Sequence, residues 1–222
     1  MILSQILACI VYARRPLRLD ELCESIAILG ASDCDNVDKS QRLFRSMALK
    51  LCEPLIQIED IDTAHGKIST CTLTHGSVRQ FLVKHPKCLS RSEPLACEIT
   101  EEVMANICLK YLWQSRYQRL LIQSKDTFED YTGEDVMEHH LLSYAAKYWD
   151  KHLDGVTYTP EISSRVQNFI TSAQFFTCLQ VQSLFIGGKI LNTRDCKFHG
   201  SNYMQDNSNS GSIPTEFGQG HI

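Results

Sequence analysis

A histidine and a serine two residues apart form the first pair in this sequence that could do chemistry. His75 and Ser77 flank Gly76 at the start of a predicted helix, and a histidine beside a serine can serve as the base of a nucleophilic site. The sequence offers no acid there to orient the imidazole, and it has no G-x-S-x-G nucleophile elbow. It also lacks G-x-x-x-x-G-K-[ST], the loop that binds nucleotide phosphates. We therefore predict no catalytic residue, no cofactor and no enzymatic activity.

Three short groups of residues that could bind a metal are incomplete. His139 and His140 are adjacent, so on a helix their side chains point in different directions. Cys196-x-x-His199 supplies two ligands where a structural zinc needs four. The acidic run at residues 33–37 lacks the glycine and the terminal glutamate of a calcium loop. The sequence therefore predicts no metal site.

Composition favours a cytoplasmic protein. The 222 residues carry a net charge of -4 and ten cysteines. The cysteines show no C-x-x-C spacing, and half of them fall in apolar periodic stretches, where a thiol behaves as a small hydrophobic group. The apolar run after Met1 is too short to span a bilayer. It also lacks the basic residues that precede the apolar run of a signal peptide. We expect free thiols, a reducing compartment and no membrane partner.

The first ninety residues mix helical and strand-like spacing. An opening helix should end near Arg15, because Pro16 disfavours helical geometry at the residue before it. A second helix opens on Asp20, where the helix dipole favours acids. A third, Lys39–Leu51, has apolar residues at four-residue steps. Two strands and a further helix then follow, at residues 55–60, 67–75 and 75–85.

The second half is more plainly helical. We predict helices at Ile99–Leu112, at Gly133–Leu153 and, with a break, at Pro160–Phe185. The tail from Asn202 onward is rich in Asn, Ser and Gly and is expected to be disordered. The predicted fold class is mainly α. It comprises a winged helix with a small β-wing (1–88), a helical bundle (89–185) and a flexible C-terminal tail (186–222).

Five blocks between residues 2 and 185 carry a resemblance to a known family. They are Ile6-Leu7-x4-Tyr12-Ala13-Arg14-Arg15-Pro16-Leu17, Leu19-x-Glu21-Leu22, Cys52-x-Pro54-Leu55-Ile56, His75-x-Ser77-Val78-x2-Phe81-Leu82 and Leu142-x-Tyr144-Ala145-Ala146-x-Tyr148-Trp149-x2-His152. In this order they resemble the region that follows the NACHT domain in fungal STAND signal-transduction ATPases. That region is a winged helix, often labelled after a GPI inositol deacylase, followed by helices. It carries no nucleophile elbow, so a deacylase activity would not be transferred with the label.

The resemblance implies a role and not a reaction. In the family, an ATP- or ADP-binding NACHT domain precedes this region, and ankyrin or WD40-type repeats often follow it. The resemblance therefore implies a non-catalytic regulatory and interaction module that is a fragment of a larger protein lacking its ATPase domain. Its implied partner is a NACHT domain, in cis or in trans.

His75 is the residue to which the resemblance assigns nucleotide sensing. In related switch proteins a winged-helix histidine, within a Met-His-Asp motif, contacts bound ADP and holds the closed state. Thr74-His75-Gly76 falls at the matching point, with glycine in place of the carboxylate. An imidazole N–H at a helix N-terminus adds a donor where anions are already favoured. The structural alternative is that His75 caps the helix or bonds to the wing.

A winged-helix DNA-binding protein is the alternative function. The Lys39–Leu51 helix would then be the recognition helix. Its cations available for phosphates are Lys39, Arg42, Arg45 and Lys50. Three aspartates lie directly before this helix, and the first ninety residues are close to neutral. The sequence therefore favours a protein partner over nucleic acid.

Overall fold

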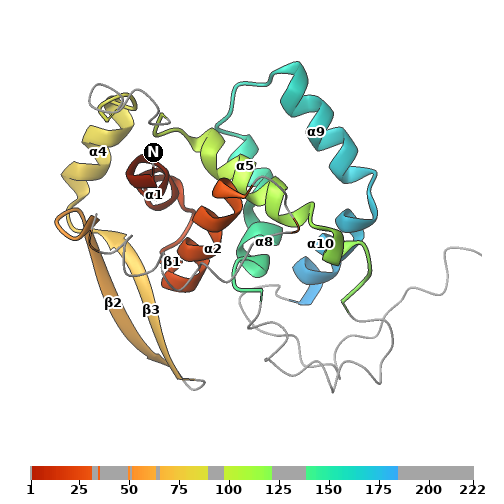
Figure 1. Cartoon of the computed structure of the whole chain (residues 1–222), viewed down its shortest axis with the longest axis horizontal. Helices are drawn as coiled ribbons and strands as arrows, with labels where there is room; N and C mark the ends of the chain where they lie inside the picture. Colours follow the sequence, from red (N-terminus) through yellow and green to blue (C-terminus); the bar gives the residue numbers. More distant parts are fainter. Residues whose placement is uncertain are drawn as a thin grey trace, which may run out of the picture. The chain divides into compact units, whose positions relative to one another are not determined.

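The computed structural model describes residues 2–31, 35, 50, 52–63, 66–89, 98–121 and 139–184 (Figure 1). Within these residues the chain is mainly helical, with one small three-stranded antiparallel sheet. The mainly α fold class is therefore confirmed. Apart from Lys50, the predicted helix at Lys39–Leu51 lies outside the described residues, as does the tail from residue 186 onward.

Two helices and a very short strand open the chain. Helix α1 (Ile2–Tyr12) ends three residues before Arg15, and α2 (Leu19–Gly30) begins close to the predicted position. Between them the sequence predicted only a turn, but Leu17–Arg18 form strand β1. This strand exists because its backbone pairs with a strand more than fifty residues later in the chain.

The sheet has the order β1-β3-β2, and all its pairings are antiparallel. Strands β2 (Ile56–Thr63) and β3 (Gly66–Leu73) form the predicted hairpin, at slightly shifted positions. Cys71 defines the register of the sheet, because it lies opposite Leu17 of β1 and opposite Ile58 of β2. Leu17 and Cys71 are buried, whereas Ile58 and Ile61 are exposed. The hairpin therefore extends beyond the core into solvent, and helix α4 (Gly76–Lys84) follows it directly.

The second half forms four α helices and one 3-10 turn within the described residues. They are α5 (Glu101–Leu112), η1 (Ser115–Tyr117), α8 (Leu142–Leu153), α9 (Pro160–Ile170) and α10 (Ala173–Leu184). The predicted break in the last helix is confirmed. It falls at Thr171 and Ser172, whose hydroxyls donate to carbonyls at the end of α9. Because α9 and α10 are separate, each can turn its apolar side to the core.

One apolar core joins the two halves of the chain. Helices α1 and α2 pack on α5, and α5 packs on α8. Ile6, Leu22, Ile107 and Ala145 all belong to the same buried cluster. Residues on both sides of the predicted boundary at 88 therefore share one core, and the boundary itself remains a prediction.

The buried cysteines behave as small apolar side chains. All seven cysteines among the described residues are thiols, and six of them are buried. Burial raises the pKa of the Cys52 thiol to about 11 and that of Cys178 to about 12. These thiols stay protonated near neutral pH, so they contribute to packing and are poor nucleophiles.

The shared core predicts that a cavity in α1 destabilises the helices of the second half. Ile6→Ala should lower the free energy of unfolding by about 2–5 kcal/mol, as large-to-small changes in a core do. Trp149 is buried against Phe169 and Phe175 and reports on α8. Its fluorescence and the circular dichroism should shift together in denaturant. A fluorescence midpoint unchanged by Ile6→Ala would contradict the shared core, and Ile61→Ala, on the exposed hairpin, is the matched control.

Candidate functional site

His75 lies at the N-terminal end of α4, where the sequence placed it. Its backbone is extended, with φ -148° and ψ 140°, as an N-cap residue requires. Its Nδ1 accepts the backbone N–H of Ser77 at 3.2 Å and lies 2.8 Å from the Ser77 hydroxyl oxygen. The capping role is therefore confirmed, and nucleotide sensing remains a prediction.

The cap decides which imidazole nitrogen can face a partner. Because Nδ1 is the acceptor, the neutral ring carries its proton on Nε2. The side chain is exposed, and Nε2 makes no hydrogen bond to any described residue. Nε2–H can therefore donate to an oxygen acceptor such as a phosphate or a carboxylate. The same geometry does not make a catalytic triad, since no described carboxylate orients the ring.

A second group of polar residues forms a closed polar ring between distant parts of the chain. Arg14 donates from Nη2 to Glu101 Oε1 and to the Lys151 carbonyl, and its backbone N–H donates to the Tyr144 hydroxyl oxygen at 2.9 Å. The Tyr144 oxygen lies 3.0 Å from His152 Nε2. His152 Nδ1 lies 3.3 Å from Glu101 Oε1, which closes the ring. The polar ring thus joins the α1–β1 turn to the start of α5 and the end of α8.

Burial sets the proton positions in the polar ring. His152 is fully buried, and burial, followed by the Arg14 guanidinium, lowers its pKa to about 4. The imidazole is therefore neutral near pH 7. Since the Tyr144 oxygen accepts from Arg14, we assign its O–H as the donor to His152 Nε2. Nδ1–H then donates to Glu101, so every member of the polar ring has a partner.

Arg15 connects α2 to the polar ring through Glu21 and Tyr144. Its guanidinium binds Glu21 through two hydrogen bonds of 2.7 and 2.6 Å, and it lies 5.1 Å from the centre of the Tyr144 ring. Glu21 also accepts the Arg18 backbone N–H at 2.7 Å, which satisfies a donor at the start of α2. Adjacent arginines therefore bind different carboxylates: Arg14 binds Glu101 and Arg15 binds Glu21.

A buried carboxylate connects α2, α5 and the start of α8. Glu24 accepts the Tyr111 hydroxyl at 2.8 Å and the Leu141 backbone N–H at 2.7 Å. Burial raises the pKa of Glu24, while these two donors act in the opposite direction. Nearby, Lys110 donates to the carbonyl of Ala31 at the end of α2. The two halves of the chain are therefore linked by directed polar contacts as well as by the apolar core.

The other residues singled out in the sequence are not brought together. Among the described residues, no group of three His, Cys, Asp or Glu side chains could hold a metal ion. The His139 ring lies edge-on to Tyr117, with 5.5 Å between ring centres. Cys196, His199 and most of the acidic run at 33–37 lie outside the described residues. No helix in the described part of the chain is long and apolar enough to cross a membrane.

The sequence patterns did not predict the polar ring, although three of its members lie in the blocks that carry the family resemblance. Arg14, Tyr144 and His152 entered only through the resemblance, and Glu101 fell within the predicted helix at Ile99–Leu112. One signal was present in the sequence. Tyr144 and His152 are eight residues apart, so they share a face of α8 that is otherwise apolar. Two polar side chains on a buried face indicate a buried polar partner.

Gly155 provides a test of the polar ring that removes none of its members. A Cβ atom at this position would overlap the Glu101 carboxylate, which Arg14 and His152 already hold in place. Gly155→Ala should therefore displace Glu101 and lower the free energy of unfolding by about 1–3 kcal/mol. Gly30→Ala is the matched control, because nothing lies within 4 Å of its added Cβ. Equal denaturation midpoints for these two variants would mean that the polar ring does not stabilise the fold.

The buried imidazole predicts a loss of stability in acid. The pKa of His152 is lowered from 6.5 to about 4, so between these values the unfolded chain binds more protons than the folded chain. The contribution of neutral, buried His152 to the free energy of unfolding is therefore complete above pH 6.5. It is lost as the pH falls towards 4, which lowers the free energy of unfolding by up to about 3 kcal/mol. Urea unfolding of the natural chain and of His152→Gln between pH 4 and 7 gives a curve of the free energy of unfolding against pH for each protein, and the natural chain should lose more stability in acid. Two parallel curves would show that His152 does not titrate in this way.

Comparison with known proteins yields no relative: no family model, no curated protein and no solved structure matches the chain. Any role must therefore be argued from the residues and contacts above.

Proposed function

We propose that this chain is a non-catalytic, cytoplasmic regulatory module that packs against a nucleotide-binding NACHT domain, in cis or in trans, and relays its nucleotide state. The observation that carries the proposal is the geometry of His75. Its Nδ1 is used in capping α4, so the neutral ring carries its N–H on Nε2, in an exposed side chain at the N-terminal end of a nine-residue helix. A helix N-terminus favours anions, and an added imidazole donor strengthens that preference.

The order of the elements supports the winged-helix part of the proposal. A helix, a short strand and a second helix are followed by a two-stranded hairpin, and the short strand pairs with the second strand of that hairpin. A helix at Lys39–Leu51 would complete a winged helix. The hairpin is then the wing, and α4 is the helix that follows it.

The contacts of α4 offer a route from His75 to the rest of the chain. Leu82 packs in a buried cluster with Leu7 and Val11 of α1. Arg79 donates from Nε to the Val11 carbonyl at 3.1 Å. Two residues after α1 ends, Arg14 enters the polar ring and so reaches α5 and α8. A displacement of α4 would therefore be carried by α1 into the helical region as a rigid-body movement.

The test separates the capping role of His75 from nucleotide sensing. The full chain is added in trans to a nucleotide-free NACHT domain taken from a protein that carries the five sequence blocks, and the affinity of this mixture for ADP is measured by calorimetric titration. His75→Ala should weaken ADP binding about tenfold or more, which is the loss of one hydrogen bond to a charged group. His75→Asn should weaken it similarly, although asparagine retains the helix cap.

His85→Ala is the matched control, since His85 is exposed at the opposite end of α4. This variant should leave the ADP affinity unchanged. The proposal fails if His75→Ala binds ADP as the natural chain does, or if the chain has no effect on the ADP affinity of the NACHT domain. Sensitivity to His75→Ala but not to His75→Asn would assign the effect to the cap alone.

A further inference from the structure

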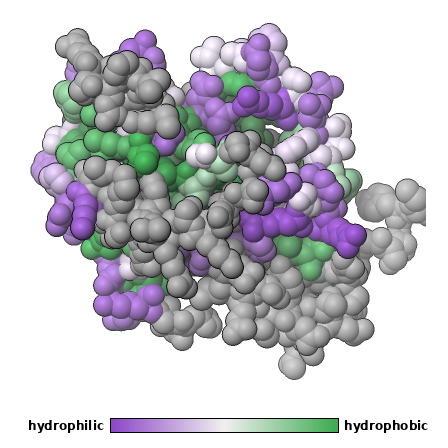
Figure 2. Space-filling view, in the orientation of Figure 1, coloured by the Kyte–Doolittle hydropathy of each residue, from purple (hydrophilic) through white to green (hydrophobic). Residues whose placement is uncertain are grey.

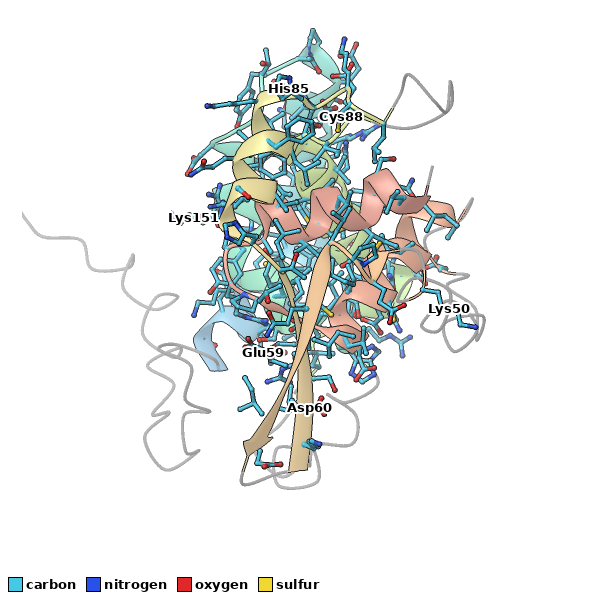
Figure 3. All side chains as sticks on the ribbon, turned by 90° about the vertical axis from the view of Figure 1, so that its left-hand side faces the viewer. Lys50, Glu59, Asp60, His85, Cys88 and Lys151 are labelled. Carbon is cyan, nitrogen blue, oxygen red and sulfur yellow. The ribbon has the colours of Figure 1, made fainter. Side chains whose placement is uncertain are left out.

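One side of the molecule carries two elements of opposite charge. Figure 3 shows α4 and the hairpin both on the side facing the viewer, with His85 labelled on the helix and Glu59 and Asp60 on the hairpin below it. From Gly76 to Lys87 the charged side chains are all cationic: Arg79, Lys84 and Lys87. Strand β2 carries only acids: Glu59, Asp60 and Asp62. In Figure 2 the end of the hairpin, at the lower left, is coloured as hydrophilic.

Each of these elements also exposes large apolar side chains. Phe81 on α4 is 53% exposed, and Ile61 on β2 is 49% exposed. Helical spacing places Phe81 on the same side of α4 as Lys84, and the two-residue period of a strand places Ile61 on the same face as Glu59. An apolar side chain therefore lies beside a cation on the helix and beside an anion on the strand. Protein–protein interfaces combine an apolar centre with a polar rim, and these two elements offer side chains for both.

Contacts within the chain neutralise some of these charges and leave others of each sign without an ion partner. Lys87 pairs with Glu98 at 2.8 Å. Asp60 pairs with Lys67 across the hairpin at 3.0 Å. Glu59 accepts only a neutral amide, from Gln57 at 3.1 Å. Lys84 forms no ion pair with any of the described residues. Asp62 likewise forms no ion pair with the described residues. Glu59 and Asp62 on the strand and Lys84 on the helix are therefore charges that a second surface would have to match.

We propose that this face, made of α4 and β2, binds the same face of a second copy of the chain. A two-fold rotation places the cationic helix of each copy against the acidic strand of the other, so a single contact occurs twice. Phe81 then packs on Ile61 of the second copy, and Lys84 pairs with its Glu59. A face with separate positive and negative halves is complementary to its own copy after a two-fold rotation. The acids of β2 would repel nucleic acid or an anionic membrane, and the cations of α4 would repel a basic peptide.

Sedimentation equilibrium of the full chain tests the proposal, and it does not depend on a NACHT partner. We expect a monomer–dimer equilibrium with a dissociation constant between about 1 µM and 1 mM, weaker at high salt. Phe81→Ser should raise this constant about tenfold or more, as loss of a buried aromatic anchor does. Phe176→Ser, at an exposed phenylalanine on α10, is the matched control and should leave it unchanged.

A charge exchange tests the register of the two copies. Lys84→Glu and Glu59→Lys should each weaken the dimer, and the double variant should restore it, because every pair is then reversed and intact. Both positions are exposed, and thermal unfolding checks that each variant folds. The proposal is overturned if the chain is monomeric up to about 1 mM, if Phe176→Ser dissociates the dimer as strongly as Phe81→Ser, or if the double variant stays as weak as the single ones. Salt-sensitive binding to duplex DNA or to phosphatidylserine vesicles that Phe81→Ser abolishes, in a chain that remains monomeric, would also overturn it.

Discussion

The structure depends on satisfying polar groups that become buried where the two halves of the chain meet. His152 is fully buried and Glu101 is largely so, and each needs a partner from another element. Arg14 supplies one from the α1–β1 turn, and Tyr144 supplies another from α8. A buried polar group left without a partner destabilises a protein by more than the formed hydrogen bond stabilises it. The turn after α1, the start of α5 and the end of α8 must therefore stay in register.

The buried polar contacts and the exposed charged and apolar side chains of α4 and the hairpin lie on different elements. The polar groups of α2, α5 and α8 bond to one another around Glu24 and the polar ring. Helix α4 and the hairpin carry exposed apolar and charged side chains, and α4 buries little beyond Leu82. Both proposals above therefore assign recognition to α4 and the hairpin. Contacts of α4 with α1 connect this surface to the core.

Local residue patterns were enough to predict the long helices, whereas contacts between residues far apart in the chain could not be predicted from the sequence. The four-residue spacing from Ile99 to Leu112 predicted α5 well, because helix formation depends on neighbouring residues. Strand β1 was missed because two residues become a strand only through their partner, and Leu17 lies opposite Cys71. The polar ring was missed for the same reason. Glu101 looks like any acid in a first helical turn, and the fold alone brings it to His152.

The case of His75 shows how geometry can change an interpretation without adding a residue to it. From the sequence, capping and sensing were alternatives, since both place a histidine before the first turn of a helix. In the structure the cap uses Nδ1, and this leaves the proton of the neutral ring on Nε2 of an exposed side chain. The two roles therefore use different nitrogen atoms of one ring. Capping orients the imidazole so that it can donate to an anion, and the two interpretations become compatible.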